Sequence, residues 1–166
     1  MRGVLVDSDV LLDVLTEDDR WFEWSSDAIT RLGEDRLLVI NPIIYSELSL
    51  AFRRIEDLDA AIPPSIRREP LPWPTAFLAG RCREASRRRG EPVREADLYI
   101  GAHAAIRGYT LLTRHPAPYA ARFPALELHA PAPAPAPAEP GPDAATAAPA
   151  ESAALRQLGL SLGLPA

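Results

Sequence analysis

Three acidic residues far apart in the chain, Asp7, Glu47 and Asp97, occupy comparable places in the expected secondary structure. Asp7 directly follows a short apolar run, Glu47 lies one turn into a helix after the second such run, and Asp97 begins a later helix. In open parallel sheets, side chains at such places meet beyond the carboxyl ends of the strands. Carboxylates gathered there repel one another, so the pattern predicts a divalent cation, and oxygen ligands favour Mg²⁺ or Mn²⁺.

Each acid also has an ordinary structural interpretation. Asp7 or Ser8 would cap the helix that the apolar spacing after them predicts. Glu47 would be a solvated helix residue, and Asp97 would interact favourably with the N-terminus of its own helix. Capping by Asp7 is compatible with a role in a site.

Short apolar runs alternate with helical segments, which predicts an α/β fold with a mostly parallel sheet. Strands are expected at residues 4–6, 37–40, 110–113 and 126–128. Helices are expected from 42 to about 54, from about 74 to just before Gly90, and from about 96 to 107, with Gly108 as the stop. Small residues of the last helix, Gly101, Ala104 and Ala105, would let it lie close to the sheet.

Charge is distributed unevenly along the 166 residues, whose net charge is −5. Residues 1–35 carry ten acids and three arginines, whereas residues 67–94 carry eight arginines and three glutamates. The second stretch suits an anionic partner, or it is the solvated face of a helix. No apolar run approaches the roughly 20 residues that span a bilayer, and no signal peptide is evident, so we expect a cytoplasmic protein without a membrane partner. The lone Cys82 has no disulfide partner within the chain.

Composition changes sharply near residue 130. We expect a folded domain at residues 1–129, with a core of ordinary size. Residues 130–152 are rich in proline and alanine and predict a disordered, extended linker, because they offer few large apolar groups to bury. A leucine-rich segment, residues 153–166, follows.

Four stretches occur in this order along the chain: VLVDSDVLLDVL, NPIIYSELS, READLYIGAHAAIRG and YTLLTRHPAPYAARFP. Together they resemble the PIN domain family, and more narrowly the VapC-like toxins of bacterial toxin–antitoxin pairs. The resemblance covers residues 3–129. It implies a three-layer α/β/α fold and a metal-dependent endoribonuclease, in which Asp7, Glu47 and Asp97 bind the metal and carry catalysis. It also implies a VapB-like antitoxin as partner and a homodimer.

One position departs from the family pattern. Members often carry a fourth acid where this chain has His115 in the sequence LLTRH. An imidazole can ligate a metal, but it removes one negative charge from the site. Asp9, where an uncharged polar residue is usual, offsets that loss in part and is a further candidate ligand.

The implied chemistry is hydrolysis of an RNA phosphodiester by water that Mg²⁺ or Mn²⁺ activates, with no protein nucleophile. Ser8 or Thr113 would orient that water. Four arginines are candidates for gripping the RNA backbone: Arg87, Arg88, Arg89 and Arg94.

Two other interpretations stay open. The chain would be a catalytically weak or inactive PIN scaffold that binds RNA or protein, an alternative that His115 favours. The sequence DSDV also resembles the opening of haloacid-dehalogenase-like phosphatases, with Asp7 as nucleophile and Asp9 as general acid. That chemistry normally needs a lysine, as it does in receiver domains of response regulators, and the chain contains none.

Overall fold

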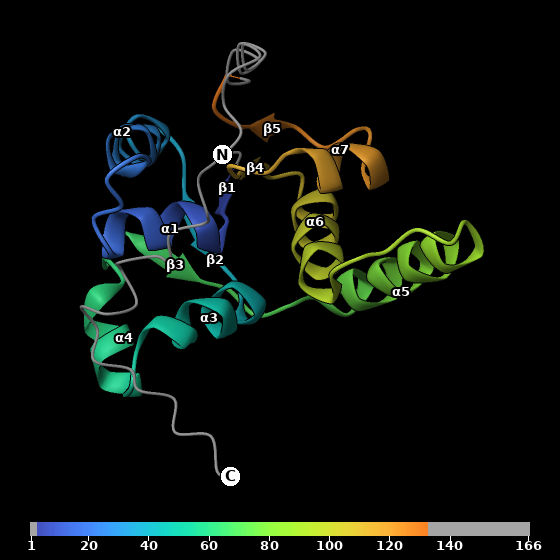
Figure 1. Cartoon of the computed structure of the whole chain (residues 1–166), viewed down its shortest axis with the longest axis horizontal. Coiled ribbons are helices and arrows are strands. Elements are labelled where there is room, and N and C mark those ends of the chain that lie inside the picture. The colour runs from blue at the N-terminus through green and yellow to red at the C-terminus, as the bar shows by residue number, and fades with distance from the viewer. Residues whose placement is uncertain (1–2, 133–166) are drawn as a thin grey trace, which may run out of the picture. The chain divides into compact units, whose positions relative to one another are not determined.

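The computed structural model describes residues 3–132, whose strands form one parallel sheet in the order β3-β2-β1-β4-β5 (Figure 1). The strands are β1 (Val4–Val6), β2 (Leu38–Ile40), β3 (Ile66–Arg68), β4 (Thr110–Leu112) and β5 (Leu128–His129). Every residue of β1, β2 and β4 is buried, although successive residues of a strand point to opposite faces. Both faces are therefore covered by helices, and the predicted α/β fold is confirmed.

Among residues 3–132 the helices are α1 (Ser8–Leu15), α2 (Phe22–Gly33), α3 (Pro42–Leu48), α4 (Ile55–Ala61), α5 (Trp73–Arg88), α6 (Glu95–Arg107) and α7 (Ala117–Arg122). Four of them, α1, α3, α5 and α6, lie largely where the sequence predicts, and the other three, α2, α4 and α7, were not predicted. Asn41 caps α3, because its side-chain oxygen accepts the N–H groups of Ile43 and Ile44. Gly108 ends α6 in the left-handed conformation, with φ of 65°. Helices α5 and α6 pack against each other (Figure 1).

Three expectations differ from the structure. Strand β3 was not predicted, because Arg67 and Arg68 are exposed at the edge of the sheet and mask any apolar run. The helix expected to run from residue 42 to about 54 ends at Leu48 and continues only as a 3₁₀ turn, Ser49–Ala51. The Ser49 hydroxyl donates to a backbone carbonyl there, an interaction that competes with regular helix. The last strand begins two residues later than expected.

The small residues of α6 have different neighbours: Ala104 packs in the core cluster of the sheet strands, as expected, but Gly101 does not face the sheet. Gly101 faces the ring of Phe123, and a Cβ on Gly101 would lie 2.3 Å from a ring carbon. Ala104 is buried, whereas Ala105 is exposed. The close approach that glycine permits is therefore between α6 and the end of α7.

Two sequence predictions concern parts of the chain outside this description. The expected linker, residues 130–152, lies outside it from residue 133 onward, and the leucine-rich segment, residues 153–166, lies wholly outside it. Among residues 3–132, none of the helices has both the length and the apolar character to cross a membrane.

Candidate active site

The order of the strands creates a divergence point between β1 and β4. The chain leaves β1 for β2 and β3 on one side and returns through β4 and β5 on the other. Asp7 follows β1, and its backbone N–H donates to the carbonyl of Leu112 at the end of β4 (2.9 Å). Ligands of open α/β sheets bind in the crevice at such a point.

A cavity of about 440 Å³ opens at this divergence point. It brings together the three acids predicted from distant parts of the sequence, because α1, α3 and α6 all present residues to it. The side chains that line it are Asp7, Ser8, Asp9, Leu12, Glu47, Leu50, Arg94, Asp97, Arg114, His115, Pro118 and Tyr119. The cavity is therefore rich in carboxylates, with two arginines at its walls.

Asp7 is buried at the base of α1 and is held by two donors. One carboxylate oxygen accepts the Ser8 N–H (2.8 Å), and the other accepts the Tyr119 hydroxyl (2.9 Å). Burial, followed by the nearby charge of Asp9, raises the pKa of Asp7 to about 7. Asp7 thus caps its helix, as one interpretation predicted, and also faces the cavity.

Glu47 and Asp97 form a second acidic pair in the cavity. The Ser8 hydroxyl donates to Oε2 of Glu47 (2.6 Å), and Arg94 donates to Oε1 (2.8 Å). The same guanidinium lies 3.6 Å from Asp97. Burial raises the pKa of Asp97, the Arg94 charge opposes that rise, and the Glu47 charge adds to it.

Asp9 connects α1 to the loop after β4. Its Oδ2 accepts the Arg114 backbone N–H (3.1 Å) and lies 2.8 Å from Nδ1 of His115. Oδ1 of Asp9 is buried and has no hydrogen-bond partner among the described residues. The side chain of His115 is 70% exposed, so it is the carboxylate of this pair that points into the protein.

The donor set fits a hard divalent cation, since it consists of carboxylate oxygens and includes the orphaned oxygen of Asp9. As the side chains stand within residues 3–132, however, no three acidic, histidine or cysteine groups lie close enough together to hold one ion. Hydroxyls and a guanidinium bind oxygens of Asp7 and Glu47 instead. Binding a cation would require these oxygens to exchange partners.

Some predicted site residues are not part of the cavity wall. Thr113 does not line the cavity but lies beside its acids, because its hydroxyl donates to Oδ2 of Asp9 (3.5 Å) and accepts the His115 N–H (3.1 Å). Arg87, Arg88 and Arg89 also lie outside its wall: the first two pair with Glu84 and the third with Glu91. Of the four arginines predicted to bind RNA, only Arg94 reaches the acids.

Sequence reasoning missed two residues of the cavity, Tyr119 and Arg114. Tyr119 is buried on α7, a helix that was not expected, although it lies in the last of the four stretches that resemble the PIN family. Arg114 pairs with Asp13 (3.2 Å), and its guanidinium lies over the ring of Trp21 (5.3 Å). Neither contact can be found from local sequence, because each joins separate elements.

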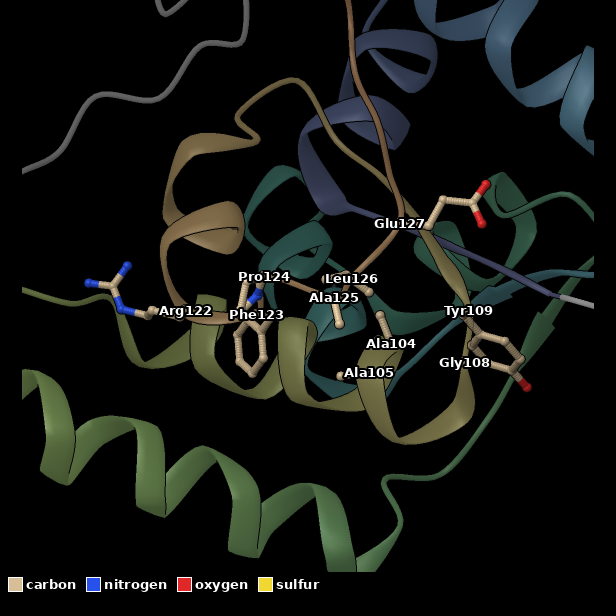
Figure 2. A pocket seen from close by; sticks show the side chains of 10 residues that line it. All are labelled: Ala104, Ala105, Gly108, Tyr109, Arg122, Phe123, Pro124, Ala125, Leu126 and Glu127. Atoms are coloured by element: carbon tan, nitrogen blue, oxygen red, sulfur yellow. The ribbon is translucent and has the colours of Figure 1, made fainter.

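A second cavity, of about 510 Å³, lies between the end of α6 and the segment before β5 (Figure 2). Its wall is largely apolar and includes Phe123 and Leu126. Its one carboxylate, Glu127, pairs with Arg36 (3.6 Å). This cavity lacks the convergent acids of the first.

Comparisons with known proteins agree with this architecture. The model of the PIN domain family matches residues 4–120. Among solved structures, VapBC2 from Rickettsia felis bound to a promoter DNA fragment has a TM-score of 0.62 at 17% identity, covering 76% of this chain and 97% of that one. VapBC-1 from nontypeable Haemophilus influenzae has a TM-score of 0.61 at 18% sequence identity and covers 76% of this chain and 96% of that one. FitAcB from Neisseria gonorrhoeae has a TM-score of 0.58 at 21% identity and covers 75% of this chain and 95% of that one. No curated protein sequence matches the chain.

Proposed function

Because the chain belongs to the PIN domain family, we propose that it is a divalent-metal-dependent endoribonuclease and the toxin of a toxin–antitoxin pair. One observation carries this proposal: Asp7, Glu47 and Asp97 converge on one cavity at the divergence point of the sheet. A fold by itself does not require three acids to meet there, because like charges in a partly buried cavity are costly.

In this proposal, Asp7, Glu47 and Asp97 hold the cation. A bound Mg²⁺ or Mn²⁺ would supply stabilisation of charge on the scissile phosphate and a water of lowered pKa. Tyr119 keeps the Asp7 carboxylate in place through its 2.9 Å hydrogen bond, and Ser8 does the same for Glu47 at 2.6 Å. The protein contributes positioning and an acidic cavity, and no side chain acts as nucleophile.

Asp9 supplies the negative charge that His115 does not. Its Oδ2 is fixed by the loop after β4, which leaves the buried and unpartnered Oδ1 available. This chain thus carries a negative charge on the first turn of α1, at Asp9, in place of the acid that relatives often have on the loop after β4. On this basis the departure at His115 is compatible with an active site.

The solved structures that resemble the chain include toxin–antitoxin complexes, among them VapBC from Salmonella typhimurium bound to DNA. We infer a VapB-like antitoxin that presents a basic side chain to the acidic cavity, where charge complementarity favours it. A homodimer is the expected assembly of the toxin itself. Light scattering of the purified full chain, alone and with the antitoxin, measures both stoichiometries.

The test is cleavage of total RNA and transfer RNA by the purified full chain with Mg²⁺, Mn²⁺ or EDTA. We compare the natural sequence with Asp7→Asn and with Asp57→Asn, a matched control on the exposed face of α4. Cleavage that needs a cation, is lost in Asp7→Asn and is kept in Asp57→Asn is the expected result.

If no RNA is cut with either metal while all three proteins are folded, the inactive scaffold becomes the better interpretation. It predicts RNA or protein binding without cleavage. The phosphatase alternative does not agree with the chain, which belongs to the PIN family and contains no lysine.

A further inference from the structure

We infer that Arg94 is an internal counter-ion of the acidic cavity, which occupies Glu47 and Asp97 when no cation is bound and competes with the cation for them. The inference rests on the proposed function, since it concerns metal binding at the same site. It assigns Arg94 a specific task that differs from a general grip on RNA.

The contacts of Arg94 carry the argument. One guanidinium nitrogen donates to Oε1 of Glu47 at 2.8 Å, and the other lies 3.6 Å from Oδ1 of Asp97. Glu47 belongs to α3 and Asp97 to α6, so a single cationic group bridges acids from two helices. A divalent cation held by these acids would need the same oxygens.

The place of Arg94 in its helix is unfavourable by local rules. Arg94 is the N-cap of α6, and its side chain makes no capping hydrogen bond. A cation at a helix N-terminus is repelled by the helix dipole, and uncharged or acidic residues are preferred there. The position therefore lacks a local reason for arginine, whereas the carboxylates across the cavity provide one.

Exposure indicates that Arg94 can leave. Its side chain is 74% exposed, while those of Glu47 and Asp97 are only 20% and 12% exposed. The acids are thus fixed in the wall, and the arginine reaches them from solvent. Moving it out breaks an ion pair of modest strength and buries nothing new.

The second arginine of the cavity is held differently. Arg114 is 20% exposed, pairs with the buried Asp13 at 3.2 Å and lies over the ring of Trp21. It makes no contact with Glu47 or Asp97 among the described residues. The Arg114 guanidinium lies 3.9 Å from Oδ2 of Asp9. Arg114 is therefore a charge-matched control that shares the cavity but does not cover Glu47 or Asp97.

The experiment measures Mn²⁺ affinity of the metal-free full chain by calorimetric titration, without RNA. The variants are Arg94→Gln, Arg94→Lys as the charge-preserving rescue, and Arg114→Gln. We expect Arg94→Gln to bind Mn²⁺ roughly fivefold more tightly, which corresponds to about 1 kcal/mol. The Mn²⁺ affinity of Arg94→Lys should stay near that of the natural protein. Arg114→Gln should also bind Mn²⁺ more tightly, but the gain in the logarithm of its affinity should be about half that of Arg94→Gln or less.

A second readout is the thermal midpoint with EDTA and with Mn²⁺. Arg94→Gln leaves the two acids without a counter-ion, so its midpoint should rise more on addition of Mn²⁺ than that of the natural protein. Equal or weaker Mn²⁺ binding by folded Arg94→Gln overturns the inference and leaves the proposed function standing. Equal gains in Arg94→Gln and Arg114→Gln also overturn it, because cavity charge alone then explains the affinity. Absence of Mn²⁺ binding in every protein overturns both the inference and the proposed metal dependence.

Discussion

Replacing Asp7 by asparagine should stabilise the metal-free protein, and more so at high pH. The native pKa of Asp7 is about 7, against an ordinary value of 3.8, because burial and the charge of Asp9 disfavour ionisation. The native state therefore binds the proton more tightly than the unfolded state does, and stability falls as pH rises from about 4 to about 7. Asparagine has a similar shape and can still cap α1 and face Tyr119, but it carries no charge.

The expected size follows from the two pKa values. Compared with a side chain that does not titrate, the raised pKa of Asp7 lowers the free energy of unfolding by roughly 2 kcal/mol at about pH 5 and roughly 4 kcal/mol at about pH 8. The difference in unfolding free energy between Asp7→Asn and the natural protein should thus grow by about 2–3 kcal/mol between these pH values, in favour of the variant.

Urea unfolding in EDTA at both pH values measures this double difference, in which hydrogen-bond effects common to both pH values cancel. Saturating Mg²⁺ should reverse the order, since a cation at the carboxylates stabilises only the natural protein to a large extent. A stability difference that stays constant between the two pH values would show that Asp7 ionises normally in the native state, and it would refute the reasoning.

Two further predictions test the packing and the hydrogen bonding around the site. In the same urea assay, Gly101→Ala should lower the unfolding free energy by about 1–3 kcal/mol, because the new Cβ clashes with Phe123. Gly80→Ala in α5 should raise it by about 0.5–1 kcal/mol, because no atom lies within 4 Å of a Cβ at that position and alanine favours helix. A loss of stability in Gly80→Ala as large as in Gly101→Ala would contradict this. Tyr119→Phe removes the hydrogen bond to Asp7 and should cost about 1–3 kcal/mol at about pH 8, but less at about pH 5, where Asp7 is protonated. A cost independent of pH would mean that Tyr119 acts only through packing.

Local sequence determined the elements that carry the acids. The apolar run before Asp7 is β1, the Asn41–Pro42 pair starts α3 just before Glu47, and Gly108 ends the helix that contains Asp97. These signals work because caps, stops and buried strands depend on residues only a few positions apart. The order of the motifs then sufficed to identify the family and its parallel sheet.

Only the tertiary structure decided how the side chains pair. The arginines expected to face RNA are divided by their partners: Arg87 binds Glu84 beside it on α5, while Arg94 crosses to Glu47 on α3. Tyr119 meets Asp7 from a position 112 residues away. The sequence therefore specified which acids the chain has and where the elements that carry them begin. The charge state of Asp7 and the counter-ion of Glu47 depend on burial and on contacts between elements, which no local pattern contains.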